Sequence, residues 1–488
     1  MKKYLFFFFV LNFSFLFAQH PEIKRATHWY FGANAGLDFS NDTVIADVNG
    51  AYDNYEAAAT ISDTAGNLLF YTDAETVWNR NHQVMQNGTS IGGCWSSTQG
   101  ALIVPQPGND SLYYIFTTDC AENNLAGGLR YSIVNINLDN GLGAVIQKGI
   151  LLHTPVAEKI AGIYHANKTD VWVVTHEWNN SNFLAYLITN SGIDTVPVIS
   201  SIGSVHSGFT QNGNSNGYMK FSPNGKKIVS IKYESSILEL FDFNDSTGII
   251  SNSLMLNSGG NMLVYGASFS PDNSKLYVSY PFDSQVTIGG KLYQFNILAG
   301  SSSDIIASKT LIYYSNGISK YHFLGIQIGL NNKIYLAETF FQTNDGGFLG
   351  VINEPNKIGA ICNFAQLGIP LLGKRSRGGL PNFIESYFNC DTCTVDSSAV
   401  GIIEPTYLSS AISIFPNPLN GVLHIECPYE ILSWQITDVH GIIVNKCTLH
   451  PPQKNVQISN LSLPHGIYAI SIKTKSATIT KKLMQLKD

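Results

Sequence analysis

Six residues with titratable or hydrogen-bonding side chains stand at the entrances to short apolar runs along the chain. They are Glu56, Gln99, Glu158, Lys159, His322 and Arg377. If the fold brings them together, these side chains can bind a sugar, a peptide terminus or a cation, and a histidine beside a glutamate can act as a general acid and base. The alternative is that water in a central channel solvates these groups and that they neutralise one another.

The chain carries none of the short motifs that indicate a particular reaction. It has no P-loop, H-E-x-x-H helix or well-spaced calcium loop. His176-Glu177 lacks the second histidine of a zinc protease, and we expect it to lie in a loop just past a strand. Cys390 and Cys393 form a lone C-x-x-C, which favours a local disulfide over zinc. We therefore predict no catalytic residue, no metal and no cofactor.

The apolar runs belong to a repeat that occurs six times. In each copy an apolar strand enters a polar turn and leaves as an aromatic-rich strand. The turns lie at residues 63–67, 107–111, 166–170, 223–226, 271–274 and 329–332. Proline fixes φ at the first corner, and Asn, Asp and Gly tolerate positive φ at the next. A second hairpin follows, so each repeat predicts a four-stranded antiparallel sheet, which is the blade of a propeller.

Segments at the two ends of the repeats supply a further blade. Three strands without an innermost partner are expected at residues 28–32, 37–39 and 43–46. One strand without followers is expected at residues 380–387, and its pairing with the first three removes a free edge strand. The predicted fold is therefore all-β, a seven-bladed β-propeller over residues 19–388. Eight blades result if residues 200–216 hide further strands.

Composition agrees with an exported all-β protein. Charged residues make up 13% of the 488 residues and aromatic residues 12%, and the chain has 43 glycines, which suits many tight turns. The net charge of −6 has no basic stripe, so nucleic-acid binding has no support. A short positive start, an apolar run and Ala18 predict a signal peptide over residues 1–18, and no other run is long enough to cross a bilayer.

Seven cysteines are too few to be the main scaffold of this chain. Three pairs are candidates for disulfides in an exported protein: Cys94 with Cys120, Cys390 with Cys393, and Cys427 with Cys447. The odd count leaves at least one thiol over, and we expect it to be Cys362.

The last part of the chain alternates in seven short strands, which predicts a small β-sandwich over residues 412–488 after a Ser/Thr-rich linker at residues 389–411. Its turns carry an ordered set of motifs: P-N-P, then G, then D-x-x-G, then G-x-Y. These residues are Pro416, Asn417, Pro418, Gly421, Asp438, Gly441, Gly466 and Tyr468. This order resembles the C-terminal sorting domain of the type IX secretion system of Bacteroidota. The resemblance implies that the domain contacts the secretion machinery and that the protein reaches the medium or the outer cell surface after export to the periplasm.

The propeller region resembles a family of exported Bacteroidota propeller proteins that carry the same tail. The matching segments lie at residues 29–32, 59–63, 70–73, 77–79, 96–99 and 379–381. The resemblance implies adhesion or surface roles in some members but no defined reaction.

We therefore expect an exported platform that binds an extracellular protein or glycan. Tryptophans such as Trp78, Trp95 and Trp178 offer stacking surfaces for sugars, although packing between blades is the more common role of Trp. The alternatives are a secreted propeller hydrolase, lactonase-like or glycan-acting, with a site in the channel mouth, and a passive structural component of the cell surface.

Overall fold

The computed structural model divides the chain into two compact units, Met1–Asp396 and Ser397–Asp488. It describes residues 21–389 and 413–485, apart from 42, 209–212, 261, 282–288, 316–320, 341–345, 420, 439–442, 460, 462 and 475–477. The predicted signal peptide, the linker beyond Asn389 and the pair Cys390 and Cys393 lie outside the described residues. In the described residues, no helix is long and apolar enough to span a membrane.

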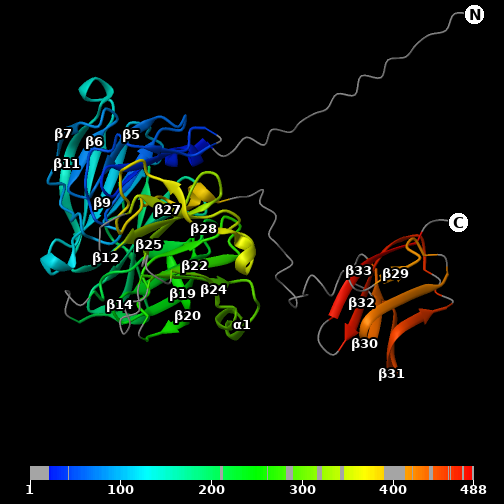
Figure 1. The fold of residues 1–488 in the computed structure, drawn as a ribbon. Helices are drawn as coiled ribbons and strands as arrows, with labels where there is room; N and C mark the ends of the chain where they lie inside the picture. Colours follow the sequence, from blue (N-terminus) through cyan, green and yellow to red (C-terminus); the bar gives the residue numbers. More distant parts are fainter. Residues whose placement is uncertain are drawn as a thin grey trace, which may run out of the picture. The chain divides into compact units, whose positions relative to one another are not determined.

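All six predicted repeats form antiparallel strand pairs in the first unit (Figure 1). The inner pairs are β4 (Ala59–Ser62) with β5 (Leu68–Thr72), β8 (Ala101–Pro105) with β9 (Leu112–Thr118), β12 (Val156–Tyr164) with β13 (Val171–Glu177), β17 (Met219–Phe221) with β18 (Lys227–Lys232), β21 (Ala267–Phe269) with β22 (Lys275–Tyr280), and β25 (Tyr321–Ile328) with β26 (Ile334–Phe340).

The second hairpin of each repeat continues the same sheet outward. The outer strands are β6 (Thr76–Asn79) and β7 (Val84–Thr89), β10 (Leu129–Asn135) and β11 (Ala144–His153), β14 (Asn180–Thr189) and β16 (Val198–His206), β19 (Ile237–Asn244) and β20 (Ile249–Ser258), β23 (Lys291–Asn296) and β24 (Thr310–Tyr314), and β27 (Phe348–Ile352) and β28 (Phe364–Pro370). A short β15 (Gly192–Ile193) also pairs with β14, and one parallel pair between β7 and β11 joins the first two repeats.

The turn chemistry expected from the sequence is present. The Asp63 carboxylate accepts hydrogen bonds from the backbone N–H groups of Ala65 and Asn67, both at 2.9 Å. Gly225 and Asn273 take the positive φ that the corners of their turns require, at +71° and +63°. The short helices lie elsewhere, at η1 (Pro21–Ala26), η2 (Ala121–Asn123), η3 (Asp139–Gly141), α1 (Ser302–Ala307) and η5 (Gly359–Cys362).

The innermost strands follow one another around a ring, because β4, β8, β12, β17, β21 and β25 each contact the next. A three-stranded sheet of β1 (His28–Phe31), β2 (Ala35–Asp38) and β3 (Ile45–Asp47) lies between the first and last of these repeats. Its Phe39 and Trp29 rings lie 5.5 Å from the Tyr335 ring of β26, and Tyr30 lies 4.5 Å from Tyr71 of β5. The first unit is therefore a propeller-like, all-β ring.

The prediction of a strand at residues 380–387 is wrong. This stretch is extended, makes one parallel bridge between Ile384 and Gly162, and ends in the helix η6 (Glu385–Phe388). It does lie beside the N-terminal sheet, since the Phe383 ring is 5.8 Å from that of Trp29. The segment forms no β-ladder with the N-terminal sheet, because its polar side chains, Asn382 and Glu385, bond to other inner strands.

Asn382 makes those contacts near the centre of the ring. Its side-chain amide donates to the carbonyls of Ala101 on β8, at 3.2 Å, and Ile160 on β12, at 2.8 Å. Its backbone N–H donates to the carbonyl of Ala58, at 2.9 Å. One buried residue thereby ties three neighbouring repeats to the end of the unit.

A buried ion pair holds the same segment from the other side. The Lys220 ammonium on β17 donates to the Glu385 carboxylate and to the Gln327 amide of β25, each at 2.5 Å. The Lys220 and Glu385 side chains are only 2% and 3% exposed. The segment from Leu380 to Phe388 therefore fills the middle of the ring. We name it the axial segment.

Residues 200–216 do not add a blade. Their described part contains the end of β16, which pairs with β14 as the outer strand of the third repeat.

The second unit is one curled five-stranded sheet rather than two sheets of a sandwich. Its strands are β29 (Ser413–Phe415), β30 (Leu423–Thr437), β31 (Ile443–Ile458), β32 (Gly466–Thr474) and β33 (Thr478–Gln485). The sequence predicts seven strands because its pattern divides the residues of β30 into two strands and those of β31 into two. Each of the two is one continuous strand, and the pairing between them shifts register between Glu426 and Ser433, where the sequence predicts a break.

The structure tests three of the cysteine predictions. Cys94 and Cys120 form a disulfide, and Cys362 is a buried free thiol, as expected. The predicted pair Cys427 and Cys447 is wrong, because Cys427 is buried on β30 while Cys447 is exposed on β31 and the two are not bonded.

Replacing Lys220 by Met should destabilise the first unit by about 3–5 kcal/mol, because the Glu385 carboxylate is then left buried without a cation. The double variant Lys220→Met/Glu385→Leu should recover part of that loss, since neither charge remains. Urea unfolding of the three proteins measures the effect. A single variant within about 0.5 kcal/mol of the parent contradicts the assignment.

Replacing Cys94 and Cys120 by Ser should lower the free energy of unfolding by about 3 kcal/mol, since the bridge closes a loop of moderate length in the unfolded chain. Thermal unfolding measures the change, and Cys447→Ser serves as the control. Equal melting temperatures for the double serine variant and the parent would show that the bridge adds nothing.

Candidate functional site

Four of the six predicted site residues meet in a buried polar layer at one end of the inner strands. Glu158 is fully buried and accepts hydrogen bonds from the backbone N–H groups of Thr98, at 3.1 Å, and Ala121, at 2.6 Å. Its carboxylate also accepts from the Asn216 amide at 3.1 Å. The disulfide helps to place this contact, since Cys120 directly precedes Ala121.

The other members of the layer are bonded in the same way. The Gln99 side chain accepts from the backbone N–H of Met219 at 2.5 Å, and Glu56 accepts from the Tyr265 hydroxyl. The Lys159 ammonium donates to the carbonyls of Asn216 and Ile231. These side chains thus join the entrances of inner strands from different repeats.

Burial favours the neutral forms of the titratable side chains in this layer, because it raises the pKa of the glutamates and lowers that of the lysine. It raises the pKa of Glu158 to about 7 and lowers that of Lys159 to about 7. The pKa of Glu56 lies well above its ordinary value because of burial and then the nearby Glu158 charge. The Glu158 and Lys159 side chains are therefore desolvated and engaged with backbone groups.

The remaining two predicted residues lie elsewhere. Arg377 is partly exposed and pairs with the Asp53 carboxylate at 2.7 Å. His322 is half-buried on β25, and burial lowers its pKa.

Metal-binding geometry is sparse in the described residues. The only group of three His, Cys, Asp or Glu ligand atoms within 4.8 Å of one another there is Cys94, Cys120 and Glu122. The two sulfurs of this group are joined in the disulfide.

A pair of buried histidines was missed by the sequence reasoning. His176 lies within β13, not in a loop, and its ring centroid is 3.7 Å from that of His206 on β16. Their Nδ1 atoms lie 2.8 and 3.3 Å from the carbonyls of Glu177 and Ser204. Burial lowers the pKa of His176 to about 3 and that of His206 well below its ordinary value, so both rings are neutral at physiological pH.

The three tryptophans considered for stacking differ in exposure. Trp178 is buried, and Trp78 lies against Tyr71 with a 13° interplanar angle. Trp95 is 46% exposed, and its carbonyl accepts from the backbone N–H of Glu56, next to Tyr55, which is 41% exposed. Tyr55 was not predicted, and its position directly before Glu56 was the one signal for it in the sequence.

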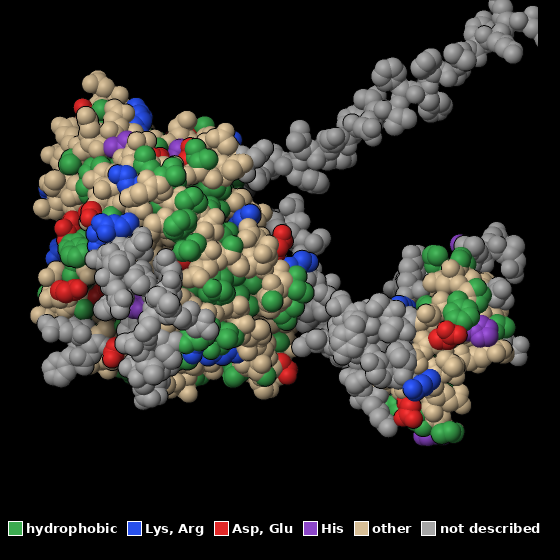
Figure 2. Space-filling model, viewed as in Figure 1, with side chains coloured by type: hydrophobic (Ala, Val, Ile, Leu, Met, Phe, Trp, Pro, Cys, Tyr) green, Lys and Arg blue, Asp and Glu red, His purple; other side chains and the backbone are tan. Residues whose placement is uncertain are grey.

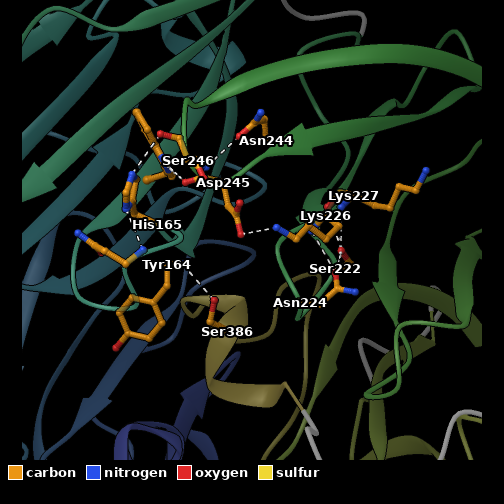
Figure 3. Close-up of polar contacts among 12 residues, drawn as sticks. Tyr164, His165, Ser222, Asn224, Lys226, Lys227, Asn244, Asp245, Ser246 and Ser386 are labelled. Atoms are coloured by element: carbon orange, nitrogen blue, oxygen red, sulfur yellow. Dashed lines mark hydrogen bonds and ion pairs between the residues drawn. The ribbon is translucent and has the colours of Figure 1, made fainter.

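A small cavity of about 140 Å³ opens where the axial segment ends, at the opposite ends of the inner strands. It is lined by Tyr164, His165, Ala166, Lys168, Pro223, Asn224, Asp245, Ser386 and Asn389. Figure 3 shows the Lys226 ammonium reaching the Asp245 carboxylate, at 2.7 Å, and the Ser386 hydroxyl accepting from the backbone N–H of Tyr164, at 3.1 Å. His165 accepts from the backbone N–H of Asn167 and lies 3.2 Å from the Ser246 carbonyl, so its polar atoms fix the turn.

Charged side chains form no large patch of one sign on the face seen in Figure 2. Basic and acidic groups are scattered there singly or in small groups. This agrees with the mild net charge of −6.

The motif residues of the second unit bind its last strand. The Asn417 side chain accepts from the backbone N–H of Met484 at 2.9 Å, and the N–H of Leu419 donates to the carbonyl of Met484 at 2.7 Å. The Tyr468 hydroxyl donates to the Pro464 carbonyl at 2.7 Å, and Gly421 has a φ of +89°. Pro416, Pro418, Asp438 and Gly466 lie in or beside these turns and strand ends, and Gly441 lies outside the described residues.

Comparisons with known proteins identify the second unit. Residues 413–485 match the family described as "Secretion system C-terminal sorting domain". No curated protein matches the chain.

Three solved structures that resemble the chain have low sequence identity to it and low TM-scores. A protein from Lactobacillus plantarum is 11% identical over 89% of this chain and 99% of its own, with a TM-score of 0.37. The periplasmic gluconolactonase of Pseudomonas aeruginosa is 9% identical over 79% and 95%, with a TM-score of 0.35. Hydrazine synthase of Kuenenia stuttgartiensis is 11% identical over 68% and 88%, with a TM-score of 0.37. Such TM-scores decide neither fold nor function.

The ordered P-N-P, G and G-x-Y turns, their contacts with the last strand and the family match agree on one conclusion. The second unit is a C-terminal sorting domain of the type IX secretion system, and the protein is secreted or attached to the cell surface.

Proposed function

We propose that this protein is an exported binding platform, in which the propeller-like unit presents its faces to an extracellular protein or glycan. The observation that carries the proposal is the use of the buried polar layer. The Glu158 carboxylate accepts from two backbone N–H groups and an amide, and the Lys159 ammonium donates to two carbonyls. Groups held in this way fix loops, and they are poorly placed to accept protons from a substrate.

The domain plan that goes with this proposal has four parts. A signal peptide covers residues 1–18, the propeller residues 19–388, a linker residues 389–411 and the sorting domain residues 412–488. We take the sheet of β1, β2 and β3, with the extended part of the axial segment at its inner side, as the seventh blade. The contacts of Trp29 with Tyr335 and Phe383 support this arrangement.

A hydrolase with its site in the channel mouth is the competing proposal. It requires a cluster of catalytic or metal-ligating side chains that substrate can reach. The buried layer of Glu56, Gln99, Glu158 and Lys159 has side chains no more than a few per cent exposed, which favours the binding platform.

Deleting residues 413–488 should leave the protein inside the cell envelope, since the deletion removes the segment that the secretion system reads. The measurement is immunodetection of the protein in periplasmic, outer-surface and medium fractions of a host with a type IX secretion system. If the truncated chain reaches the medium in the same amount as the parent, the sorting domain does not direct export.

A point variant refines this test. Asn417→Ala should reduce the exported fraction several-fold, because the Met484 N–H loses its side-chain acceptor and the last strand loosens. Asn455→Ala, at an exposed position on β31, is the matched control and should be exported normally. Equal export of the two variants would show that the Asn417 contact is not needed for export.

A further inference from the structure

Two exposed aromatic residues, Tyr55 and Trp95, lie on adjoining segments at the end of the ring that carries the buried polar layer. Tyr55 and Trp95 are 41% and 46% exposed, and among the described residues of the first unit only Phe348 is another exposed aromatic side chain. The carbonyl of Trp95 accepts from the backbone N–H groups of Glu56 and Ala57, at 3.4 and 3.2 Å, so the two rings come from adjoining segments. Exposed aromatic side chains on adjoining segments offer a ligand an apolar surface.

A disulfide and backbone hydrogen bonds hold the segments that carry these rings. Trp95 follows Cys94, which is bonded to Cys120, and its own N–H lies 3.4 Å from the Glu75 carboxylate. The carbonyl of Tyr55 accepts from the N–H groups of Gly378 and Gly379, at 2.7 and 3.1 Å. Gly378 lies directly against the Tyr55 ring, where a Cβ would come within 3.3 Å of it. Rings held in place before a ligand arrives lose little conformational entropy on binding.

Polar groups surround the two rings. Burial and the nearby Glu56 charge raise the pKa of Tyr55, and the Arg377 guanidinium lies close enough to oppose that rise. Arg377 pairs with Asp53 at 2.7 Å. On the other side, Ser96 donates to the Glu122 carboxylate at 2.9 Å. We name this surface the aromatic patch. It consists of Asp53, Tyr55, Glu75, Trp95, Glu122 and Arg377.

The chemistry of the aromatic patch fits a carbohydrate. The C–H faces of a sugar ring pack on exposed aromatic rings, while carboxylates and a guanidinium at the margin exchange hydrogen bonds with hydroxyl groups. Three carboxylates against one guanidinium make the patch acidic, which disfavours uronic or sulfated sugars. A protein interface would need a broader apolar centre than two rings among polar side chains.

We propose that the aromatic patch is a binding site for neutral oligosaccharides, with Trp95 as the main stacking surface and Tyr55 beside it. This inference rests on the proposed function and specifies its ligand. Arg377 and Asp53 orient the hydroxyl groups at the Tyr55 end, and Glu122 does so at the Trp95 end.

The test is titration calorimetry with the full chain, Trp95→Ala, Tyr55→Ala and Phe348→Ala. The probes are neutral tetrasaccharides built from glucose, mannose or xylose, with a tetrasaccharide of uronic acids as the charged comparison. We expect binding of at least one neutral probe, a loss of at least tenfold in affinity for Trp95→Ala, a smaller loss for Tyr55→Ala, and no change for Phe348→Ala. Circular dichroism of each variant checks that the fold is intact.

The outcomes separate this inference from the proposed function. Neutral-sugar binding that is unchanged in Trp95→Ala and Tyr55→Ala overturns the patch but leaves a binding platform. Stronger binding of the uronic tetrasaccharide overturns the choice of ligand. Lack of sugar binding, together with capture of a surface protein that Trp95→Ala abolishes, overturns the carbohydrate and makes the patch a protein interface. Hydrolysis of a bound probe would overturn the proposed function itself.

Discussion

The ion pair between Lys220 and Glu385 is the contact on which the first unit most depends. It lies in the middle of the ring, where two charges are almost completely removed from water and each is stable only while the other is present. Lys220 belongs to the fourth repeat and Glu385 to the end of the unit, so the pair joins the far side of the ring to the segment that closes it. Asn382 extends the same closure to the carbonyls of Ala101 and Ile160. Because the axial segment occupies the centre, surface binding has to use the ends and faces of the ring.

Most of the fold could be predicted from the sequence because it is built from local signals. The turns at Asp63, Gly225 and Asn273 need particular residues for particular φ values, and these residues recur at a regular spacing. The axial segment could not be predicted in the same way. Leu380 to Tyr387 contains strand-forming residues such as Phe383 and Ile384, but its course is decided by distant partners, above all Lys220 on the fourth repeat. The sequence also predicts breaks within the long strands β30 and β31, because prolines and polar residues inside them are typical of turns.

For the candidate sites too, the sequence predicts where residues lie along the chain but not which partners they contact. The sequence placed Glu56, Gln99, Glu158 and Lys159 at the strand entrances, and the structure gathers them there. Whether such groups face solvent or bond to the backbone depends on neighbours that the sequence does not order, such as Ala121, Asn216 and Tyr265. Tyr55 gave no signal except its place beside Glu56, whereas Trp95 stood out as a possible stacking surface. The sorting domain was the easiest part to recognise, because its function lies in an ordered set of turn motifs.

Hydrogen–deuterium exchange of the axial segment tests the central claim most directly. The Asn382 N–H is bonded to the Ala58 carbonyl inside the ring, so it should exchange only when the first unit unfolds globally. The account predicts protection equal to that of the inner strands β8 and β12. Exchange within seconds at neutral pH, with those strands still protected, would mean that the segment lies outside the ring and that the closure described above does not exist.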